Sequence, residues 1–341
     1  MTRQKRPDLG SVILDWVREN GIDWQGLSDA TGIPVGTISS KWCRLARSDE
    51  GQAAIHTRPR DIHDALELPT RRFAVDVPAP AKRRDGKWLT ALLYGDTHFH
   101  PYEDQTALDV VMGIARDLQP DVLVHMGDLV DCYSISRFDR DPARLGTLQE
   151  EIDAARTHLH QMAQLVPNAE RWLLEGNHER RLEKAIWSIP GAGQSVVQLR
   201  KVQQTLNWPT LLDLANIGYG WVPTREQSHK KILPKWILKH GEIVRKFAGY
   251  SARGEHEKYG RSGSSGHTHR TGMYKKRDHN GWHTWIETGC TCSLTPEYMN
   301  DPDWQQGCVV LTFRQSTGAF QAETIDIQHG NAIWREAEYA A

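Results

Sequence analysis

The chain has 341 residues, and its 42 Lys and Arg against 43 Asp and Glu leave a net charge of −1. This balance excludes a uniformly basic nucleic-acid-binding chain, so any affinity for a polyanion must come from local patches. The five cysteines form no CxxC pair, and no apolar stretch resembles a signal peptide or reaches membrane-spanning length. We therefore expect a cytoplasmic protein with reduced thiols and no membrane segment.

Residues 1–72 predict a small all-α domain. Residues 11–47 have the apolar spacing of three short helices, and the segment 26–42 resembles a helix-turn-helix unit, with a small residue in one helix and a glycine in the following turn. In that interpretation the second helix would present polar and basic side chains to DNA or RNA, namely Thr37, Ser39, Lys41 and Arg44. The alternative is a helical bundle that binds protein or packs on the main domain.

Residues 73–87 combine two prolines with a basic cluster and lack apolar periodicity, which predicts a linker. A larger domain is expected over 88–330, followed by a C-terminal tail at 331–341. Strands are predicted at 88–95, 121–127 and 171–176, and helices at 105–118, 142–166 and near 195–206. After residue 230, short strands are predicted at 235–239, 284–288, 308–313 and 319–327. This pattern indicates an α/β fold with a mainly parallel sheet and a second sheet packed on it.

Polar residues follow each of the first three predicted strands. The sequences are Gly-Asp-Thr-His at 95–98, Gly-Asp-Leu-Val-Asp at 127–131 and Gly-Asn-His-Glu at 176–179. Because the carboxyl ends of parallel strands meet at one edge of a sheet, we expect these side chains to form one site. Carboxylate, imidazole and amide donors without thiolate suit manganese, iron, zinc or nickel.

Two further blocks, Lys-His-Gly at 239–241 and Gly-His-Thr-His at 266–269, complete a set of five. In this order the blocks resemble the motifs of the calcineurin-like metallophosphoesterases over residues 88–329. The resemblance implies an αββα sandwich, in which two β-sheets pack together between helices, and two divalent ions bridged by Asp128. It implies that Asp96, His98 and His269 complete one metal site and that Asn177, His240 and His267 complete the other. Manganese is the default expectation.

The chemistry explains why such residues are needed. A phosphoester is negatively charged and water is a poor nucleophile, and two ions about 3.5 to 4 Å apart overcome both obstacles. The family pattern leaves His178 without a metal, as a residue that stabilises the transition state and protonates the leaving oxygen. Asp131 is expected either to orient a histidine of the site or to cap a turn. Glu179 is expected to be structural.

The segment 229–277 contains 13 basic and three acidic residues, with tyrosines among them. Because this segment also holds expected metal ligands, its positive charge should lie near the cleft and favour polyanions. Lys275, Lys276 and Arg277 are candidate contacts to nucleic acid. The alternative is a solvated loop whose lysines balance acids elsewhere. Cys132 stands where the protein phosphatases of the family carry a phosphate-binding arginine, which disfavours that branch.

We therefore expect a phosphodiesterase of phage or mobile-element type, with DNA as its substrate. One alternative is a phosphatase or cyclic-nucleotide phosphodiesterase acting on small substrates. The other is a DNA-binding regulator in which a metal site stabilises the fold.

Overall fold

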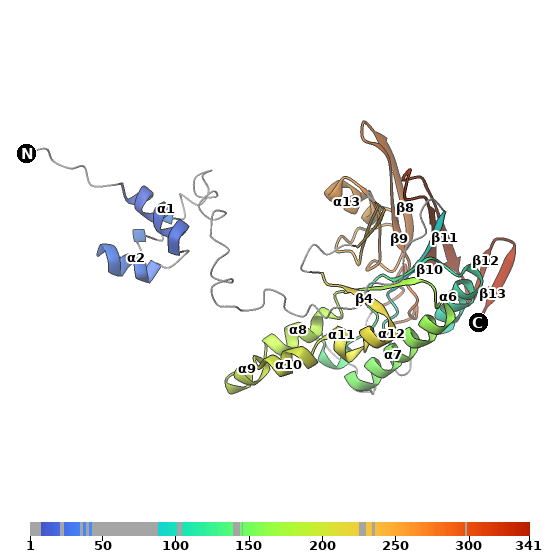
Figure 1. Ribbon diagram of the computed structural model, residues 1–341, viewed down its shortest axis with the longest axis horizontal. Helices are drawn as coiled ribbons and strands as arrows, with labels where there is room; N and C mark the ends of the chain where they lie inside the picture. Colours follow the sequence, from blue (N-terminus) through green and yellow to red (C-terminus); the bar gives the residue numbers. More distant parts are fainter. Residues whose placement is uncertain are drawn as a thin grey trace, which may run out of the picture. The chain divides into compact units, whose positions relative to one another are not determined.

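The computed structural model is shown in Figure 1. It describes residues 8–20, 24–34, 37–38, 41–42, 88–100, 104–138, 144, 146–224, 230–233, 236–296 and 299–341. The chain forms two compact units, Met1–Ala74 and Val75–Ala341. The predicted linker at 73–87 lies outside the described residues. In the part of the chain that is described, no helix has both the length and the apolar character needed to cross a bilayer.

The N-terminal unit contains helices α1 (Leu9–Asn20) and α2 (Trp24–Thr31). Its small core consists of Ile13, Leu14, Val17, Leu27, Ile38 and Trp42. Thr37 and Lys41 lie in helical backbone, and the Thr37 side chain is exposed. Ser39 and Arg44 lie outside the described residues, and nucleic-acid binding by this unit stays a prediction.

The larger unit is built on a six-stranded sheet in the order β11-β10-β1-β2-β3-β4. The strands β1 (Leu89–Tyr94), β2 (Val122–His125), β3 (Glu170–Leu174) and β4 (Tyr219–Val222) are parallel. Strands β10 (Gln306–Phe313) and β11 (Phe320–Ile327) add an antiparallel edge. The expected parallel sheet is therefore confirmed, and the carboxyl ends of its central strands lie at one edge.

A second sheet has the order β5-β6-β7-β9-β8. Its strands are β5 (Lys230–Leu233), β6 (Trp236–Lys239), β7 (Ser262–Ser265), β8 (Thr271–Asp278) and β9 (Gly281–Thr288). Leu93, Val124 and Leu174 of the first sheet share one buried cluster with Trp236, Leu238 and Ile286 of the second. The two sheets therefore pack face to face, as the sandwich prediction required.

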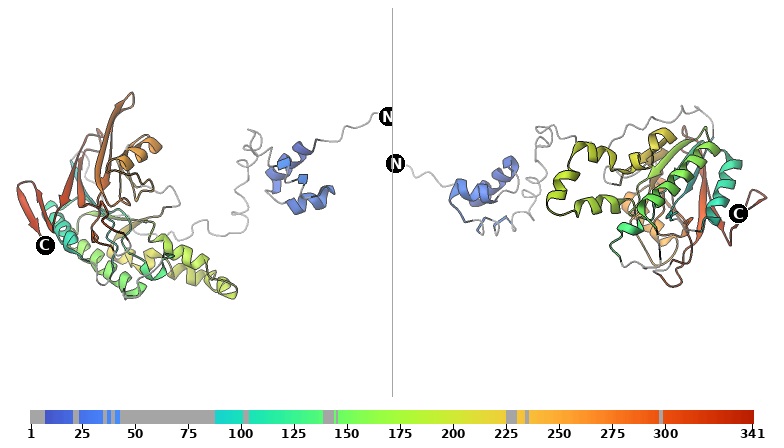
Figure 2. Two further views of the ribbon diagram at one scale, coloured as in Figure 1. Left: turned by 180° about the vertical axis from the view of Figure 1, so that it is seen from behind. Right: turned by 90° about the horizontal axis from the view of Figure 1, so that it is seen from below.

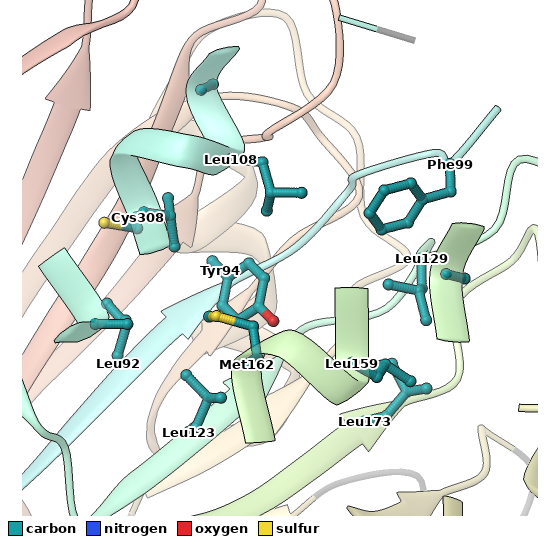
Figure 3. Packing of buried hydrophobic residues seen from close by; sticks show 14 of the residues in the cluster. Leu92, Tyr94, Phe99, Leu108, Leu123, Leu129, Leu159, Met162, Leu173 and Cys308 are labelled. Carbon is teal, nitrogen blue, oxygen red and sulfur yellow. The ribbon is translucent and has the colours of Figure 1, made fainter. Parts of the chain in front are cut away.

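Helices cover the outer faces of both sheets (Figure 2). Leu108 of α6 (Thr106–Leu118) and Leu159 of α7 (Leu148–Leu165) are buried with Leu123 of β2 in the main core (Figure 3). On the other sheet, Ala252 of α13 (Tyr250–Tyr259) packs with Trp285 of β9. The short helices α11 (Trp208–Leu211) and α12 (Leu214–Ile217) precede β4. This is the αββα arrangement.

Three expected elements differ from the structure. The helix expected over 142–166 is α7, which begins at Leu148 because Thr147 caps it by accepting from the Glu150 N–H. The helix expected near 195–206 is two helices, α9 (Ala192–Val197) and α10 (Arg200–Thr205), because Leu199 between them has extended backbone. They follow α8 (Arg180–Trp187), which itself follows the Gly-Asn-His-Glu turn.

The tail expected at 331–341 is a hairpin of β12 (Asn331–Trp334) and β13 (Ala337–Ala340). Its Ala332, Trp334 and Tyr339 side chains are buried in the main core, which fixes the hairpin to the domain. The compact fold therefore continues to Ala340.

Candidate metal centre

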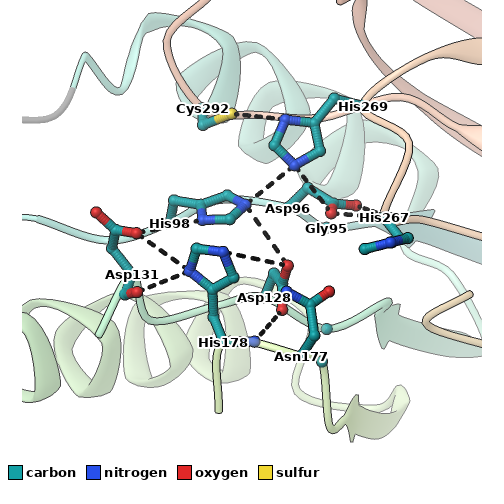
Figure 4. A network of polar contacts seen from close by, with 12 residues as sticks. Gly95, Asp96, His98, Asp128, Asp131, Asn177, His178, His267, His269 and Cys292 are labelled. Carbon is teal, nitrogen blue, oxygen red and sulfur yellow. Dashed lines mark hydrogen bonds and ion pairs between the residues drawn. The ribbon is translucent and has the colours of Figure 1, made fainter. Parts of the chain in front are cut away.

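The five sequence blocks follow β1, β2, β3, β6 and β7, and Figure 4 shows residues of four of them converging. The structure brings all seven expected metal ligands together with His178 and Asp131. The residues concerned are Asp96, His98, Asp128, Asn177, His240, His267 and His269. They come from both sheets, so the sandwich must be assembled before the site exists.

The first group of donors contains Asp96, His98, Asp128 and His269, and their donor atoms all lie within 4.8 Å of one another. His269 Nε2 is 3.3 Å from Asp96 Oδ1 and 3.1 Å from His98 Nε2. Three of these four side chains come from the first sheet and one from the turn after β7. All are buried, so a cation there would meet protein donors rather than bulk water.

The second group shares Asp128 with the first. Its Oδ2 lies 3.2 Å from His240 Nε2, and the same nitrogen lies 3.0 Å from Asn177 Oδ1. Donor atoms of Asp128, His240 and His267 lie within 4.8 Å of one another. A carboxylate that belongs to both groups is the arrangement needed to hold two cations close together.

The backbone at these ligands is unusual. Asp96, His98, Asp128, His267 and His269 have φ values of 49°, 50°, 49°, 71° and 55°, in the left-handed region that non-glycine residues rarely adopt. The neighbouring glycines provide the space, because a Cβ at Gly176 would overlap the Asp128 carboxylate and one at Gly266 would overlap that of Asp96. Such strain collects at functional sites, where the surrounding structure maintains it.

Glu179 holds the Asp128 loop in place. Its buried carboxylate accepts hydrogen bonds from the backbone N–H groups of Asp128 (3.0 Å), Leu129 (2.8 Å), Val130 (3.0 Å) and Gly176 (2.8 Å). This carboxylate therefore joins the turns after β2 and β3. The contacts fit the structural role expected for Glu179.

His178 lies beside the ligands in a network with Asp131 (Figure 4). Its Nδ1–H donates to the Asp131 carbonyl at 2.7 Å and lies 3.1 Å from Asp131 Oδ1. Its Nε2 lies 4.0 Å from Asp128 Oδ2 and 2.8 Å from a nitrogen of the Arg181 guanidinium. Arg144 also pairs with the Asp131 carboxylate. Asp131 thus contacts two arginines and the ring of His178.

The ligand histidines divide into two electrostatic classes. Burial opposes protonation of His240, but the Asp128 carboxylate outweighs it and raises the pKa to about 10. At His269, burial is outweighed by Cys292 and Asp96, and the pKa again rises to about 10. Burial, together with a neighbouring imidazole, lowers the pKa of His98 and of His267 to about 4. The buried carboxylates therefore attract positive charge, and protons compete for the same donors that a metal ion would use.

The donor set fits divalent metals. Both groups are buried and consist of imidazole, carboxylate and amide donors that share one aspartate, as manganese, iron, zinc or nickel would accept.

Sequence reasoning missed Cys292. Its Sγ lies 3.7 Å from His269 Nδ1, and His98, His269 and Cys292 form a further group of possible metal donors. The signal was available, because Cys292 follows strand β9, which runs parallel to β7 and ends at the same edge.

Lys275, Lys276 and Arg277 are not close to the ligand turn. Strand β8 leaves the turn at Thr271, and at about 3.3 Å per residue Arg277 lies roughly 20 Å further along the strand. These three residues therefore lie further along β8 than the ligand turn, and their contact with nucleic acid stays a prediction.

Local acids also neutralise part of the basic segment. Among the cations of this segment whose side chains the structure describes, six form ion pairs: Lys230 with Glu170, Lys239 with Glu255, Arg253 with Glu257, Lys258 with Glu242, Arg270 with Asp303 and Lys276 with Asp278. The charge count of the sequence therefore overstates the positive field.

Adjacent carboxylate and imidazole groups at the strand ends of a two-sheet sandwich are suited to binding metal ions. The sequence of residues 89–271 matches the calcineurin-like phosphoesterase family, and the chain belongs to that family. It is therefore a hydrolase that acts on phosphoesters.

Two phage proteins are similar to the chain. The Gene 54 protein of Mycobacterium phage D29 is 28% identical over 226 residues, which cover 62% of this chain and 84% of that protein. The Gene 54 protein of Mycobacterium phage L5 is 29% identical over 185 residues, which cover 51% of this chain and 66% of that protein. Among solved structures, Yfce, a phosphoesterase from E. coli, is 11% identical to this chain with a TM-score of 0.31. The match covers 70% of this chain and 100% of the Yfce chain.

Proposed function

We propose that this protein is a two-metal phosphodiesterase that cleaves DNA. The observation that carries the proposal is the position of Asp128 in two adjacent donor groups, with His178 beside them and outside both groups. A site that served only to stabilise the fold would have no use for a proton donor next to the metals. This argues against the regulator hypothesis.

In the proposed mechanism, Asp96, His98, Asp128 and His269 would hold one divalent ion, and Asp128, Asn177, His240 and His267 would hold the other. When bound, such ions would neutralise phosphoryl charge and lower the pKa of water. Manganese is our default choice. His178 is the general acid, and its Nε2 faces the leaving oxygen because its Nδ1–H is engaged by the Asp131 carbonyl. An Arg181 N–H lies 2.8 Å from Nε2 and can donate only to an unprotonated nitrogen, so the guanidinium must turn from Nε2 toward the phosphate when Nε2 carries the proton. General acid assistance of this kind contributes about 10²- to 10⁴-fold.

Asp131 is a positioning residue in this proposal. Its carbonyl fixes the tautomer and tilt of His178, and its carboxylate lies 3.6 Å from His98 Nδ1. A carboxylate near the second ring nitrogen of a ligand histidine can orient the ring and raise its basicity. Arg144 and Arg181, with side chains 15% and 17% exposed, keep the Asp131 carboxylate in place.

Two observations are compatible with DNA as the substrate, and the first would suit any phosphoester. The guanidinium of Arg181 lies next to the nitrogen that would face the leaving oxygen, so the site already contains a cation suited to a phosphate. The two similar proteins come from phages, which is compatible with a nucleic-acid substrate.

The second candidate function is hydrolysis of small phosphoesters, either monoesters or cyclic nucleotides. The ion pairs within the basic segment and the remote position of Lys275 to Arg277 favour it, because they reduce the field that would attract a polymer.

One set of assays separates the candidates. The purified chain with manganese is offered bis-p-nitrophenyl phosphate, p-nitrophenyl phosphate, cyclic AMP, and single-stranded and double-stranded DNA. We expect hydrolysis of the diester and of DNA. Activity confined to the monoester or to the cyclic nucleotide would refute the nuclease. If the chain binds two metal ions and hydrolyses none of these substrates, the proposed phosphodiesterase activity would be refuted.

A further inference from the structure

Two exposed aromatic side chains lie next to each other in the segment that follows His240. Phe247 is 51% exposed and Tyr250 is 59% exposed, and their ring centroids are 5.4 Å apart with the planes at 84°. The Lys246 ammonium lies 5.2 Å from the centre of the Phe247 ring. Scattered apolar residues are normal on a protein surface, but adjacent large aromatics with a cation beside them indicate a binding surface.

This segment is attached to the turn that carries the metal ligands. The buried Glu287 carboxylate accepts hydrogen bonds from the Gly249 N–H and, at 2.8 Å, from the Thr268 hydroxyl. Thr268 lies between His267 and His269. The aromatic pair therefore has a fixed position relative to the metal centre, through Glu287.

Two further contacts rigidify the attachment. Gly272 lies so close to Gly249 that a Cβ there would overlap the Gly249 backbone. The Arg270 guanidinium, one residue after His269, donates to the Arg245 carbonyl. The aromatic pair is thus held from two sides by residues adjacent to the ligands.

The charges near the pair favour an anionic partner. Arg245 and Lys246 are exposed, whereas the acids of the segment are already neutralised. Glu242 pairs with Lys239 and Lys258, and Glu257 pairs with Arg253. Aromatic faces with cations at their edge bind unpaired bases and the attached phosphates, and such stacking tolerates any base.

We propose that Phe247, Tyr250 and Lys246 form a stacking platform for an unpaired nucleobase next to the scissile phosphate. This inference rests on the proposed nuclease function. Bases within a duplex present no free face, so the platform also predicts a preference for single strands and frayed ends over intact duplex.

The test compares a double variant, Phe247→Ala with Tyr250→Ala, with the intact chain. We expect KM for an oligothymidylate to rise roughly 5- to 100-fold, since stacking on an aromatic contributes this much per base. Hydrolysis of bis-p-nitrophenyl phosphate should stay unchanged, because this substrate carries no base. Trp187→Ala serves as the matched control, since Trp187 is 47% exposed and lies on α8. It should leave both activities unchanged.

A second variant, Phe247→Leu with Tyr250→Leu, separates stacking from apolar contact. It retains apolar surface but has no ring face. Binding of an oligonucleotide that contains 2-aminopurine should quench the fluorescence of that base in the intact chain and not in the leucine variant. Equal quenching in both proteins would overturn the platform.

The outcomes distinguish this inference from the nuclease proposal. If oligonucleotides are cleaved and both double variants cleave them with unchanged KM, the platform is refuted and the nuclease stands. If oligonucleotides bind without being cleaved, and the double variants lose that binding, the platform stands and the nuclease fails. A change of oligomeric state in the alanine variant, seen by light scattering, would assign the surface to self-association and refute the inference.

Discussion

The variant His178→Ala tests whether His178 acts as a general acid or as a metal ligand. Donor atoms of His98, Asp131 and His178 also lie within 4.8 Å of one another, so His178 has the geometry to ligate a metal. We nevertheless expect an acid, because Nδ1–H is committed to the Asp131 carbonyl at 2.7 Å and Nε2 remains 4.0 Å from the shared Asp128 carboxylate. The variant should lose about 10²- to 10⁴-fold in kcat and retain two metal ions.

The leaving group provides the sharper measurement. A nitrophenolate departs with little need for a proton, whereas the alkoxide released from a dinucleotide needs one. The loss of kcat in His178→Ala should therefore be larger with a dinucleotide than with bis-p-nitrophenyl phosphate. His279→Ala, an exposed histidine in the β8–β9 turn, controls for a nonspecific effect. Equal losses on both substrates, or one missing ion by elemental analysis, would refute the assignment.

Four other changes test the remaining roles. Asp128→Asn should abolish hydrolysis and weaken binding of both ions in a metal titration, whereas loss of only one ion would disprove the bridge. Glu179→Ala leaves four buried N–H groups without acceptors and should lower the free energy of unfolding by at least about 3 kcal/mol. Glu179→Gln should lower it less. Equal stability of Glu179→Ala and the intact chain in urea denaturation would contradict this. Burial lowers the pKa of His158 to about 3, so the unfolded chain binds a proton there that the folded chain excludes. The free energy of unfolding should therefore fall by about 1 kcal/mol per pH unit as the pH drops below 6.5. Urea denaturation of metal-free protein at pH 7 and pH 5 should show a smaller fall in this free energy for His158→Gln than for the intact chain. Deletion of residues 1–80 should preserve hydrolysis of small esters and weaken DNA binding, and unchanged affinity in a filter-binding assay would remove the helix-turn-helix hypothesis.

The sequence was informative where a short strand ends in glycine followed by a polar ligand. Asp96, Asp128 and Asn177 each follow such a strand, and parallel pairing of β1, β2 and β3 brings them to one edge. The order of strands and helices was equally readable, because apolar residues recur along one face of α6 and α7. The central half of the fold and the convergence of these side chains could therefore be predicted, and their role as metal ligands stays a prediction.

Other features depend on contacts that no local pattern encodes. The basic residues of β8 are close to His267 in sequence, but the strand carries them away from it. Arg144 pairs with Asp131 while its guanidinium packs over the ring of Tyr133, in the η1 helix (Tyr133–Ile135). The hairpin at 331–340 has an alternating pattern too short to stand out, and burial of Trp334 and Tyr339 against the main core decides its structure.

The strained turns explain how the donor positions are fixed by the protein itself. Each ligand with a left-handed backbone costs roughly 1 to 3 kcal/mol, and five of them could not persist without restraint. The carboxylates of the site supply part of it. Asp96 accepts the His267 N–H at 2.9 and 3.0 Å, and Asp128 accepts the His178 N–H at 2.8 Å. Asp96 and Asp128 therefore each fix the backbone of another block, so the scaffold itself restrains the positions of the donors.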